Sequence, residues 1–266
     1  MDSINNLEKF LAKIHNGQTC LGMVVSLSDS TVSELAGDIG FDFTWIDAEH
    51  GPFTIDQIKQ HIMACRGTDC APFVRVPWNE HGIIKPVLDL APAGVIIPMI
   101  CTAEQARYAV AACKYPPVGN RGYCPTRTTG WGTDDWSKDV MGYMAECNRR
   151  CKVIPQCETA EALEEIEEIA ALPGVDGVFV GPCDLSIALG IPLEFDNPLL
   201  HRAIERILKA CQDAGKESYI FAGNMENAVY WARKGYDSIA YSLDAGVFIS
   251  AFQDLTSKFR QETSGN

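Results

Sequence analysis

Short runs of apolar residues recur along the chain, and each run is followed by a stretch with a helical pattern of apolar and polar positions. The apolar runs are continuous rather than alternating, which is typical of strands buried on both faces of a parallel sheet. They predict eight strands, at residues 20–27, 43–49, 71–77, 94–100, 151–158, 175–181, 218–223 and 238–243. Strands and helices are therefore expected to alternate along the whole chain.

Three of the expected helices begin with a capping box a few residues after a strand. In this motif a Thr side chain and a Gln or Glu side chain three residues later bond to each other's backbone. The pairs are Thr31 with Glu34, Thr54 with Gln57, and Thr102 with Gln105. Gly215 and Gly235 lie where helix C-termini are expected, because glycine readily adopts the left-handed conformation found there.

Eight strands alternating with helices predict one (β/α)8 TIM barrel, as a single domain over residues 1–266. The alternative is an open doubly wound sheet, but that fold usually has a GxGxxG motif after its first strand. Here the first strand is followed by SDSTVSEL. Residues 115–150 form an insertion too long for an ordinary connection, so we expect it to be functional or part of a subunit interface.

Composition and charge narrow the classes of function. The net charge of −13 argues against binding to nucleic acid or to an anionic membrane surface. The longest nearly apolar run, LAPAGVIIPMI, has 11 residues and is too short to span a bilayer. The N-terminal MDSINNLEKF does not resemble a signal peptide, so we expect a cytoplasmic protein. The 11 cysteines include no CxxC pair and are expected to be reduced and mostly buried.

Polar side chains collect at the ends of the predicted strands, where barrel enzymes have their active sites. One histidine, one arginine and several carboxylates come from strands far apart in sequence. These residues are Asp47, Glu49, His50, Arg75, Gln156, Glu158 and Asp184. The sequence therefore predicts a polar site at the edge of the barrel where the strands end.

Glu158 and Asp184 follow neighbouring strands and form a candidate pair of metal ligands. Carboxylate oxygens suit Mg²⁺ and Mn²⁺, which fill their remaining positions with water and substrate oxygens. The alternative is that each carboxylate caps the helix that follows it.

Arg75 and His50 are the two candidate catalytic groups. A guanidinium in an apolar strand needs an anion, which is either a substrate or the carboxylate of a purely structural salt bridge. His50 precedes a Gly-Pro break and is expected to face the cavity, although a buried histidine without chemistry is the alternative. The other four histidines, among them His61, are predicted to lie on the surface. The only lysine within a predicted strand, Lys152, stands at its start, which argues against a Schiff-base aldolase.

Five stretches resemble the class II pyruvate-dependent aldolases of the HpcH/HpaI aldolase family. They are DAEHGP, RVPWN, VIIPMICTAEQARYAVAACKYPPVGNRGY, PQCETAEAL and GVDGVFVGPCDLSIALG, and the similarity extends over about residues 20–245. The resemblance implies a carbon–carbon lyase that reversibly cleaves a 4-hydroxy-2-oxo acid to pyruvate and an aldehyde through a metal-bound enolate. It also implies a divalent ion, Mg²⁺ or Mn²⁺, with Co²⁺ as a third candidate.

The resemblance also implies a role for individual residues. Glu158 and Asp184 match the metal ligands, and Gln156 and the backbone at Cys183 match substrate contacts. His50 matches the general base and Arg75 the group that stabilises the enolate. Asp89 matches an acid that raises the basicity of the histidine. The residue pattern itself favours Asp47 for orienting His50, because Asp89 ends a predicted helix and should lie at the opposite edge of the barrel.

The motifs depart from the family pattern in three places, which leaves other functions open. Cys183 replaces the usual alanine, DAEH replaces DGEH, and RGYC replaces a glycine-richer run. Related barrels act in oxaloacetate decarboxylation, phosphonopyruvate hydrolysis or acyl-CoA cleavage, and a non-catalytic binding barrel is a further alternative. An activity on a 2-oxo acid that depends on a metal ion would separate the enzymes from the binding protein.

The insertion at residues 115–150 predicts an assembly of several subunits. Its arginines, Arg121 and Arg127, stand among glycines and aromatic residues. We expect the segment to pack on a neighbouring subunit, where Arg121 would bind a distal carboxylate of the substrate. A structural loop held by its arginines is the alternative. The chain is accordingly predicted to be a homo-oligomer, a trimer or a hexamer.

Overall fold

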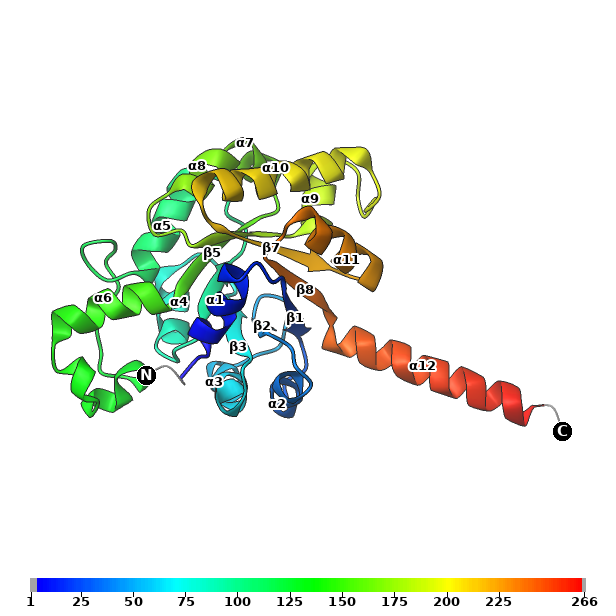
Figure 1. Cartoon of the computed structure of the whole chain (residues 1–266), viewed down its shortest axis with the longest axis horizontal. Coiled ribbons are helices and arrows are strands. Elements are labelled where there is room, and N and C mark those ends of the chain that lie inside the picture. Colours follow the sequence, from blue (N-terminus) through cyan, green and yellow to red (C-terminus); the bar gives the residue numbers. More distant parts are fainter. Residues whose placement is uncertain (1–3, 265–266) are drawn as a thin grey trace.

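The computed structural model describes residues 4–264, and its strands form a closed parallel barrel in sequence order, β1 to β8 (Figure 1). The strands are β1 (Cys20–Val25), β2 (Phe43–Asp47), β3 (Ala71–Arg75), β4 (Gly94–Ile97), β5 (Lys152–Cys157), β6 (Gly177–Val180), β7 (Glu217–Ala222) and β8 (Ser238–Leu243). All eight predicted strands are confirmed. Pairing of β1 with β8 closes the sheet and excludes the open doubly wound alternative.

Helices follow the strands and cover most of the outside of the barrel. They are α1 (Leu7–His15), α2 (Thr31–Asp38), α3 (Ile55–Ala64), α4 (His81–Leu88), α5 (Ala103–Cys113), α6 (Val140–Arg150), α7 (Ala160–Glu164), α8 (Ile166–Ala171), α9 (Pro182–Ala188), α10 (Pro198–Ala214), α11 (Met225–Lys234) and α12 (Asp244–Thr263). Three short 3-10 turns are η1 (Cys65–Gly67), η2 (Arg127–Gly132) and η3 (Asp135–Ser137).

A helix begins at or beside each of the three predicted pairs, but the full capping box forms at one of them. Thr54 and Gln57 form the full capping box of α3. Thr102 accepts the backbone N–H of Gln105 at the start of α5. The prediction for Thr31 is wrong, because α2 begins one residue after Ser30 and has no side-chain cap.

Aromatic rings fill the inside of the barrel. Phe10 of α1 closes the end at which the strands begin, with its ring centroid 5.7 Å from that of Phe43 and 5.1 Å from that of Phe73. Trp45 and Phe179 pack higher up, with centroids 4.3 Å apart. The inside of the barrel is therefore a packed core, and barrel enzymes carry their chemistry at the end where the strands finish.

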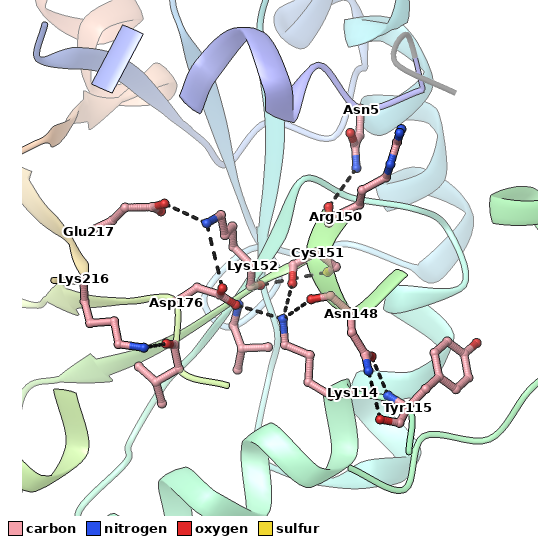
Figure 2. Close-up of polar contacts among 12 residues, drawn as sticks. Asn5, Lys114, Tyr115, Asn148, Arg150, Cys151, Lys152, Asp176, Lys216 and Glu217 are labelled. Carbon is pink, nitrogen blue, oxygen red and sulfur yellow. Dashed lines mark hydrogen bonds and ion pairs between the residues drawn. The ribbon is translucent and has the colours of Figure 1, made fainter. Parts of the chain in front are cut away.

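The edge where the strands begin, called here the N-terminal rim, carries a network of charged side chains, of which Lys114 is buried (Figure 2). Lys114 Nζ donates to Asp176 Oδ2 at 2.9 Å and to the carbonyl oxygens of Asn148 and Cys151 at 2.7 and 2.8 Å. Lys152 Nζ donates to Glu217 Oε1 at 2.7 Å. The network ties the end of the 115–150 insertion to β5 and β6. It also confirms that Lys152 lies away from the ends of the strands.

The last helix does not pack on the barrel from which it comes. The carboxylate of Asp244 accepts backbone N–H groups of Ser26 and Leu27, which fixes the start of α12. Residues 246–264 are all exposed, and α12 projects away from the barrel in Figure 1. Its exposed apolar side chains are Val247, Phe248, Ile249, Phe252, Leu255 and Phe259. No helix within residues 4–264 is long and apolar enough to cross a membrane.

Candidate active site

A cavity of about 370 Å³ opens at the edge where the strands end, called here the C-terminal rim. It is lined by Val24, Trp45, Asp47, His50, Arg75, Gln156, Gly181, Pro182, Cys183, Asp184, Phe221 and Leu243. These residues come from β1, β2, β3, β5, β7 and β8 and from the start of α9. The parallel strands thus bring together most of the polar residues that the sequence predicted at this rim.

Arg75 is held rigidly by two carboxylates. Its Nε and Nη2 donate to the two oxygens of Asp47 at 2.8 and 2.7 Å, and its Nη1 lies 2.9 Å from Glu49 Oε2. Burial disfavours the charged guanidinium, but the two carboxylates outweigh burial and raise the pKa of Arg75. The predicted salt bridge is present, and the guanidinium also lines the cavity.

Asp47 shapes the turn that carries His50. Its Oδ1 accepts the backbone N–H groups of Glu49 and His50 at 3.2 and 3.3 Å. At Gly51 a Cβ would lie only 2.2 Å from the carbonyl oxygen of Asp47, so this tight turn requires glycine. Asp47 therefore orients Arg75 and, through the backbone, the turn that carries His50.

The His50 ring is largely exposed at the mouth of the cavity. Its side chain is 69% exposed, and Nε2 lies 3.9 Å from Glu49 Oε2. Within the described residues, the ion-pair partner of the His50 ring is Glu49. Glu49 also contacts Arg75. The structural alternative of a buried, inert histidine is excluded for His50.

Glu158 is buried near the cavity. Its Oε1 accepts the N–H of Met99 at 2.7 Å, and its Oε2 accepts from Gln156 Nε2. Burial raises the pKa of Glu158 to about 7, and the negative charges of Glu49 and Asp184 add to this effect. The cap of α7 is Thr159, so Glu158 does not cap the helix that follows it.

The donor set around Glu158 fits a hard divalent ion. Asp184 stands in the first turn of α9 and raises the pKa of Glu158, so the two carboxylates repel each other. A cation between them would remove this repulsion. Gln156 Oε1 is buried without a hydrogen-bond partner in residues 4–264 and adds an oxygen. No cluster of three or more His, Cys, Asp or Glu ligands occurs in the described part of the chain, but Mg²⁺ commonly binds through one or two carboxylates.

Glycine keeps this donor set open to the cavity. A Cβ at Gly181 would lie 2.7 Å from Gln156 Nε2 and 2.9 Å from Glu158 Oε2. Any side chain at position 181 would therefore displace Gln156 and Glu158.

Asp89 and Arg121 do not lie at this rim. Asp89 ends α4, whose chain direction is opposite to that of the strands, so the residue returns to the N-terminal rim as the sequence predicted. Arg121 Nη2 donates to Asp89 Oδ1 at 2.9 Å, and the Arg121 side chain is 2% exposed. The guanidinium also lies 4.8 Å from the ring centroid of Tyr115. Within this chain Asp89 therefore does not reach His50, and Arg121 is not free to bind a substrate.

Other positions add to or correct the predicted set. Cys183 lines the cavity as predicted. Trp45 and Phe221 line it too, although their sequence pattern is that of ordinary core residues. His61, predicted at the surface, is fully buried, with Nδ1 2.8 Å from Ser33 Oγ. Arg127 donates to the carbonyl oxygen of Leu90 at 2.7 Å, as in the structural alternative for the insertion.

Comparison with known proteins identifies relatives over nearly the whole chain. A family model described as HpcH/HpaI aldolase/citrate lyase matches residues 21–251. A Klebsiella pneumoniae protein named 5-keto-4-deoxy-D-glucarate aldolase is 37% identical over 262 residues, which cover 98% of this chain and 100% of that protein.

Two solved structures share the fold. An HpcH/HpaI aldolase/citrate lyase family protein from Burkholderia cenocepacia J2315 has a TM-score of 0.87 and 30% identity, covering 96% of this chain and 99% of that chain. Protein CitE from Mycobacterium tuberculosis, solved in complex with magnesium and acetoacetate, has a TM-score of 0.56 and 18% identity, covering 84% and 85%. The second likeness extends to the fold alone.

Proposed function

The chain belongs to the HpcH/HpaI aldolase/citrate lyase family, and from this premise we propose that it cleaves a 4-hydroxy-2-oxo acid reversibly to pyruvate and an aldehyde. The reaction class is that of a carbon–carbon lyase. The observation that carries the proposal is the cavity at the C-terminal rim, where Glu158, Asp184, His50 and Arg75 meet. The first substrate to test is 5-keto-4-deoxy-D-glucarate, after the name of the Klebsiella relative.

Enzymes of this kind depend on a divalent metal ion, and here Glu158 and Asp184 would hold it. We propose Mg²⁺ or Mn²⁺, with Co²⁺ as a third candidate, because the donors are carboxylate and amide oxygens. When bound, the ion supplies Lewis-acid stabilisation of negative charge on the 2-oxo oxygen of the substrate. Gln156 and the backbone at Cys183 would contact the carboxylate end of the same acid.

His50 is proposed as the general base. It removes the proton from the 4-hydroxyl, the bond between C3 and C4 breaks, and its electron pair passes to the 2-oxo half of the substrate. The former C4 becomes the aldehyde carbon. Exposure of the ring at the cavity mouth suits this role, because the proton must then pass, directly or through solvent, to C3 of the enolate to give pyruvate.

Arg75 is proposed to donate to the oxygen on which negative charge develops. Its contact strengthens as the C3–C4 bond breaks, so it stabilises the transition state more than the bound substrate. Asp47 and Glu49 hold the guanidinium in place before the substrate arrives. Little reorganisation is then needed during the reaction.

We further propose that the chain assembles by exchange of α12 between two subunits. The exposed apolar side chains of α12 are expected to pack against an apolar surface. The barrel exposes apolar residues at α2 and α11, beside β1 and β8, which is where the last helix of a barrel would pack. They include Leu35, Ile39, Val229 and Tyr230. Exchange about a two-fold axis places each α12 on the exposed apolar residues of the other barrel.

Exchange in pairs gives an even number of subunits and favours the hexamer over the trimer. The exposed Trp131 and Met141 of the 115–150 insertion are candidates for the second contact. Light scattering across a dilution series tests the exchange. Phe248→Glu should reduce assembly, whereas Lys258→Glu on the same helix should not, and a monomeric wild-type protein would refute the exchange.

The activity is tested by following pyruvate release from a panel of 2-oxo acids in the presence of Mg²⁺ or Mn²⁺. Release from 4-hydroxy-2-oxo acids that is faster than from oxaloacetate or phosphonopyruvate is the expected result. A preference for either of the latter acids would replace the aldolase with another lyase or a hydrolase on the same scaffold.

A further inference from the structure

The floor of the cavity contains a buried hydrogen-bond donor that the described protein does not use. Trp45 is 3% exposed and lines the cavity. No atom in residues 4–264 accepts a hydrogen bond from its Nε1. A buried polar group of this kind is costly unless something meets it.

The surroundings of Trp45 place its ring beneath the catalytic groups. Trp45 precedes Asp47 by two residues on β2, so both side chains point into the barrel, with Trp45 one layer deeper. The guanidinium of Arg75 lies 4.6 Å from the centroid of the indole. Phe179 packs against the ring from below at 4.3 Å, and Phe221 lies 6.3 Å away.

Packing alone does not account for a tryptophan at this position. Phe43, Phe73 and Phe179 fill neighbouring inward positions without a polar atom. An indole adds an N–H, which buried tryptophans ordinarily satisfy with a partner. Because the ring borders the cavity, the acceptor can come from whatever occupies the cavity.

We propose that Trp45 Nε1 donates a hydrogen bond to an oxygen of the 2-oxo acid half of the substrate. The inference rests on the proposed function, since it names a further binding group of the same site. The 2-oxo half is the one that Arg75 contacts, and Arg75 lies directly over the indole. The aldehyde half lies toward the mouth, where His50 and Leu243 are exposed. Trp45 therefore recognises the part shared by all substrates.

Trp45→Phe tests the proposal, because it removes the N–H and leaves a smaller aromatic ring at the same position. The expected result is a KM about tenfold higher, the equivalent of about 1.4 kcal/mol, with kcat little changed. The factor should be the same for substrates that differ only in the aldehyde half. Without ligand the variant should lose no more stability than Trp231→Phe, because the smaller ring leaves space in both buried sites and Trp45→Phe also removes an unsatisfied donor.

The matched control is Trp231→Phe, since Trp231 is also buried but lines a neighbouring cavity of about 230 Å³ and not the active-site cavity. It should leave KM unchanged. An unchanged KM in Trp45→Phe, or a KM that rises equally in Trp231→Phe, would overturn the proposal.

Calorimetric binding of pyruvate to the Mg²⁺-loaded protein separates this inference from the proposed function. If the wild type releases no pyruvate from any acid but binds pyruvate more tightly than Trp45→Phe does, the proposed function fails and the inference stands. If the wild type is active and both proteins bind pyruvate equally, the inference fails alone. A wild type that neither releases nor binds pyruvate would overturn both.

Discussion

The two rims of the barrel differ in how their charged groups are arranged. At the N-terminal rim the charged side chains meet partners: Lys114 has three acceptors, and Lys152 is paired with Glu217 (Figure 2). At the C-terminal rim Trp45 Nε1 and Gln156 Oε1 have no partner in the described chain. The same strands run between the two rims.

This difference indicates that the N-terminal rim contributes mainly to stability and the C-terminal rim mainly to chemistry. Paired buried groups hold their elements together, and losing one partner is costly. Unpaired groups and mutually repelling carboxylates cost stability in the free protein, but they are available to an ion or a substrate. Met99, next to this site, carries a similar cost in stability in its backbone conformation. It adopts a left-handed conformation, with φ of 52°, and its N–H meets Glu158.

The largest effect is expected from Glu158→Gln at the C-terminal rim. The change should abolish binding of Mg²⁺ or Mn²⁺ and reduce kcat at least about a thousandfold, since a bound metal ion contributes several kcal/mol. The free protein should be as stable as the wild type or more so, because one of two repelling carboxylates is gone. Calorimetric metal titration and thermal unfolding check both statements. A variant less stable than the wild type would contradict the proposed repulsion between Glu158 and Asp184.

His50→Ala should reduce kcat by about 10²–10⁴, the usual contribution of a general base. Metal binding should persist, because His50 is not among the proposed ligands. Steady-state kinetics and metal titration on the same sample test this expectation. His15→Ala, a change far from the cavity, serves as the control, and an unchanged kcat in His50→Ala would remove the general base from the account.

Lys114→Met makes the corresponding change at the N-terminal rim. It leaves Asp176 without this buried partner, so the free energy of unfolding should fall by about 3–5 kcal/mol. The kcat/KM per folded molecule should stay at the wild-type value. Denaturant unfolding measures the first quantity and initial rates the second. Lys209→Met, which removes an exposed pair with Asp213, is the control and should change neither.

A smaller effect concerns His61, in the helical shell between the rims. Burial lowers the pKa of His61 below its usual 6.5, although the charges of Asp244 and Asp29 oppose this shift. The folded state thus binds fewer protons than the unfolded state, so stability is lost as the pH falls below about 6.5. His61→Gln should reduce the slope of unfolding free energy against pH by at most about 1.4 kcal/mol per pH unit. An unchanged slope between pH 7 and pH 5 would contradict it.

Most of the fold could be predicted from sequence because each strand carries its own signal. Continuous apolar runs and capping residues such as Thr54 are local features that survive packing. The position of α12 could not be predicted. An apolar helical pattern is the same whether the helix packs on its own barrel or on another subunit, so sequence shows the need for a surface but not its location.

The site was predictable where it depends on strand ends and not where it depends on packing. Arg75, Gln156 and Asp184 lie at the cavity because parallel strands end at one edge. The burial of His61 against Ser33 and the pairing of Arg121 with Asp89 depend on how helices pack. Trp45 looks like any core aromatic in the sequence, and only the cavity beside it distinguishes it.

The central claim is that the C-terminal rim performs a metal-dependent cleavage. The most direct test is the rate of pyruvate release from 5-keto-4-deoxy-D-glucarate by the full chain, measured with Mg²⁺, after addition of excess chelator, and after Mg²⁺ is restored. We expect release to stop with the chelator and to return with the metal, and Glu158→Gln to release no pyruvate under any of the three conditions. Full activity of the wild type in excess chelator would contradict the account.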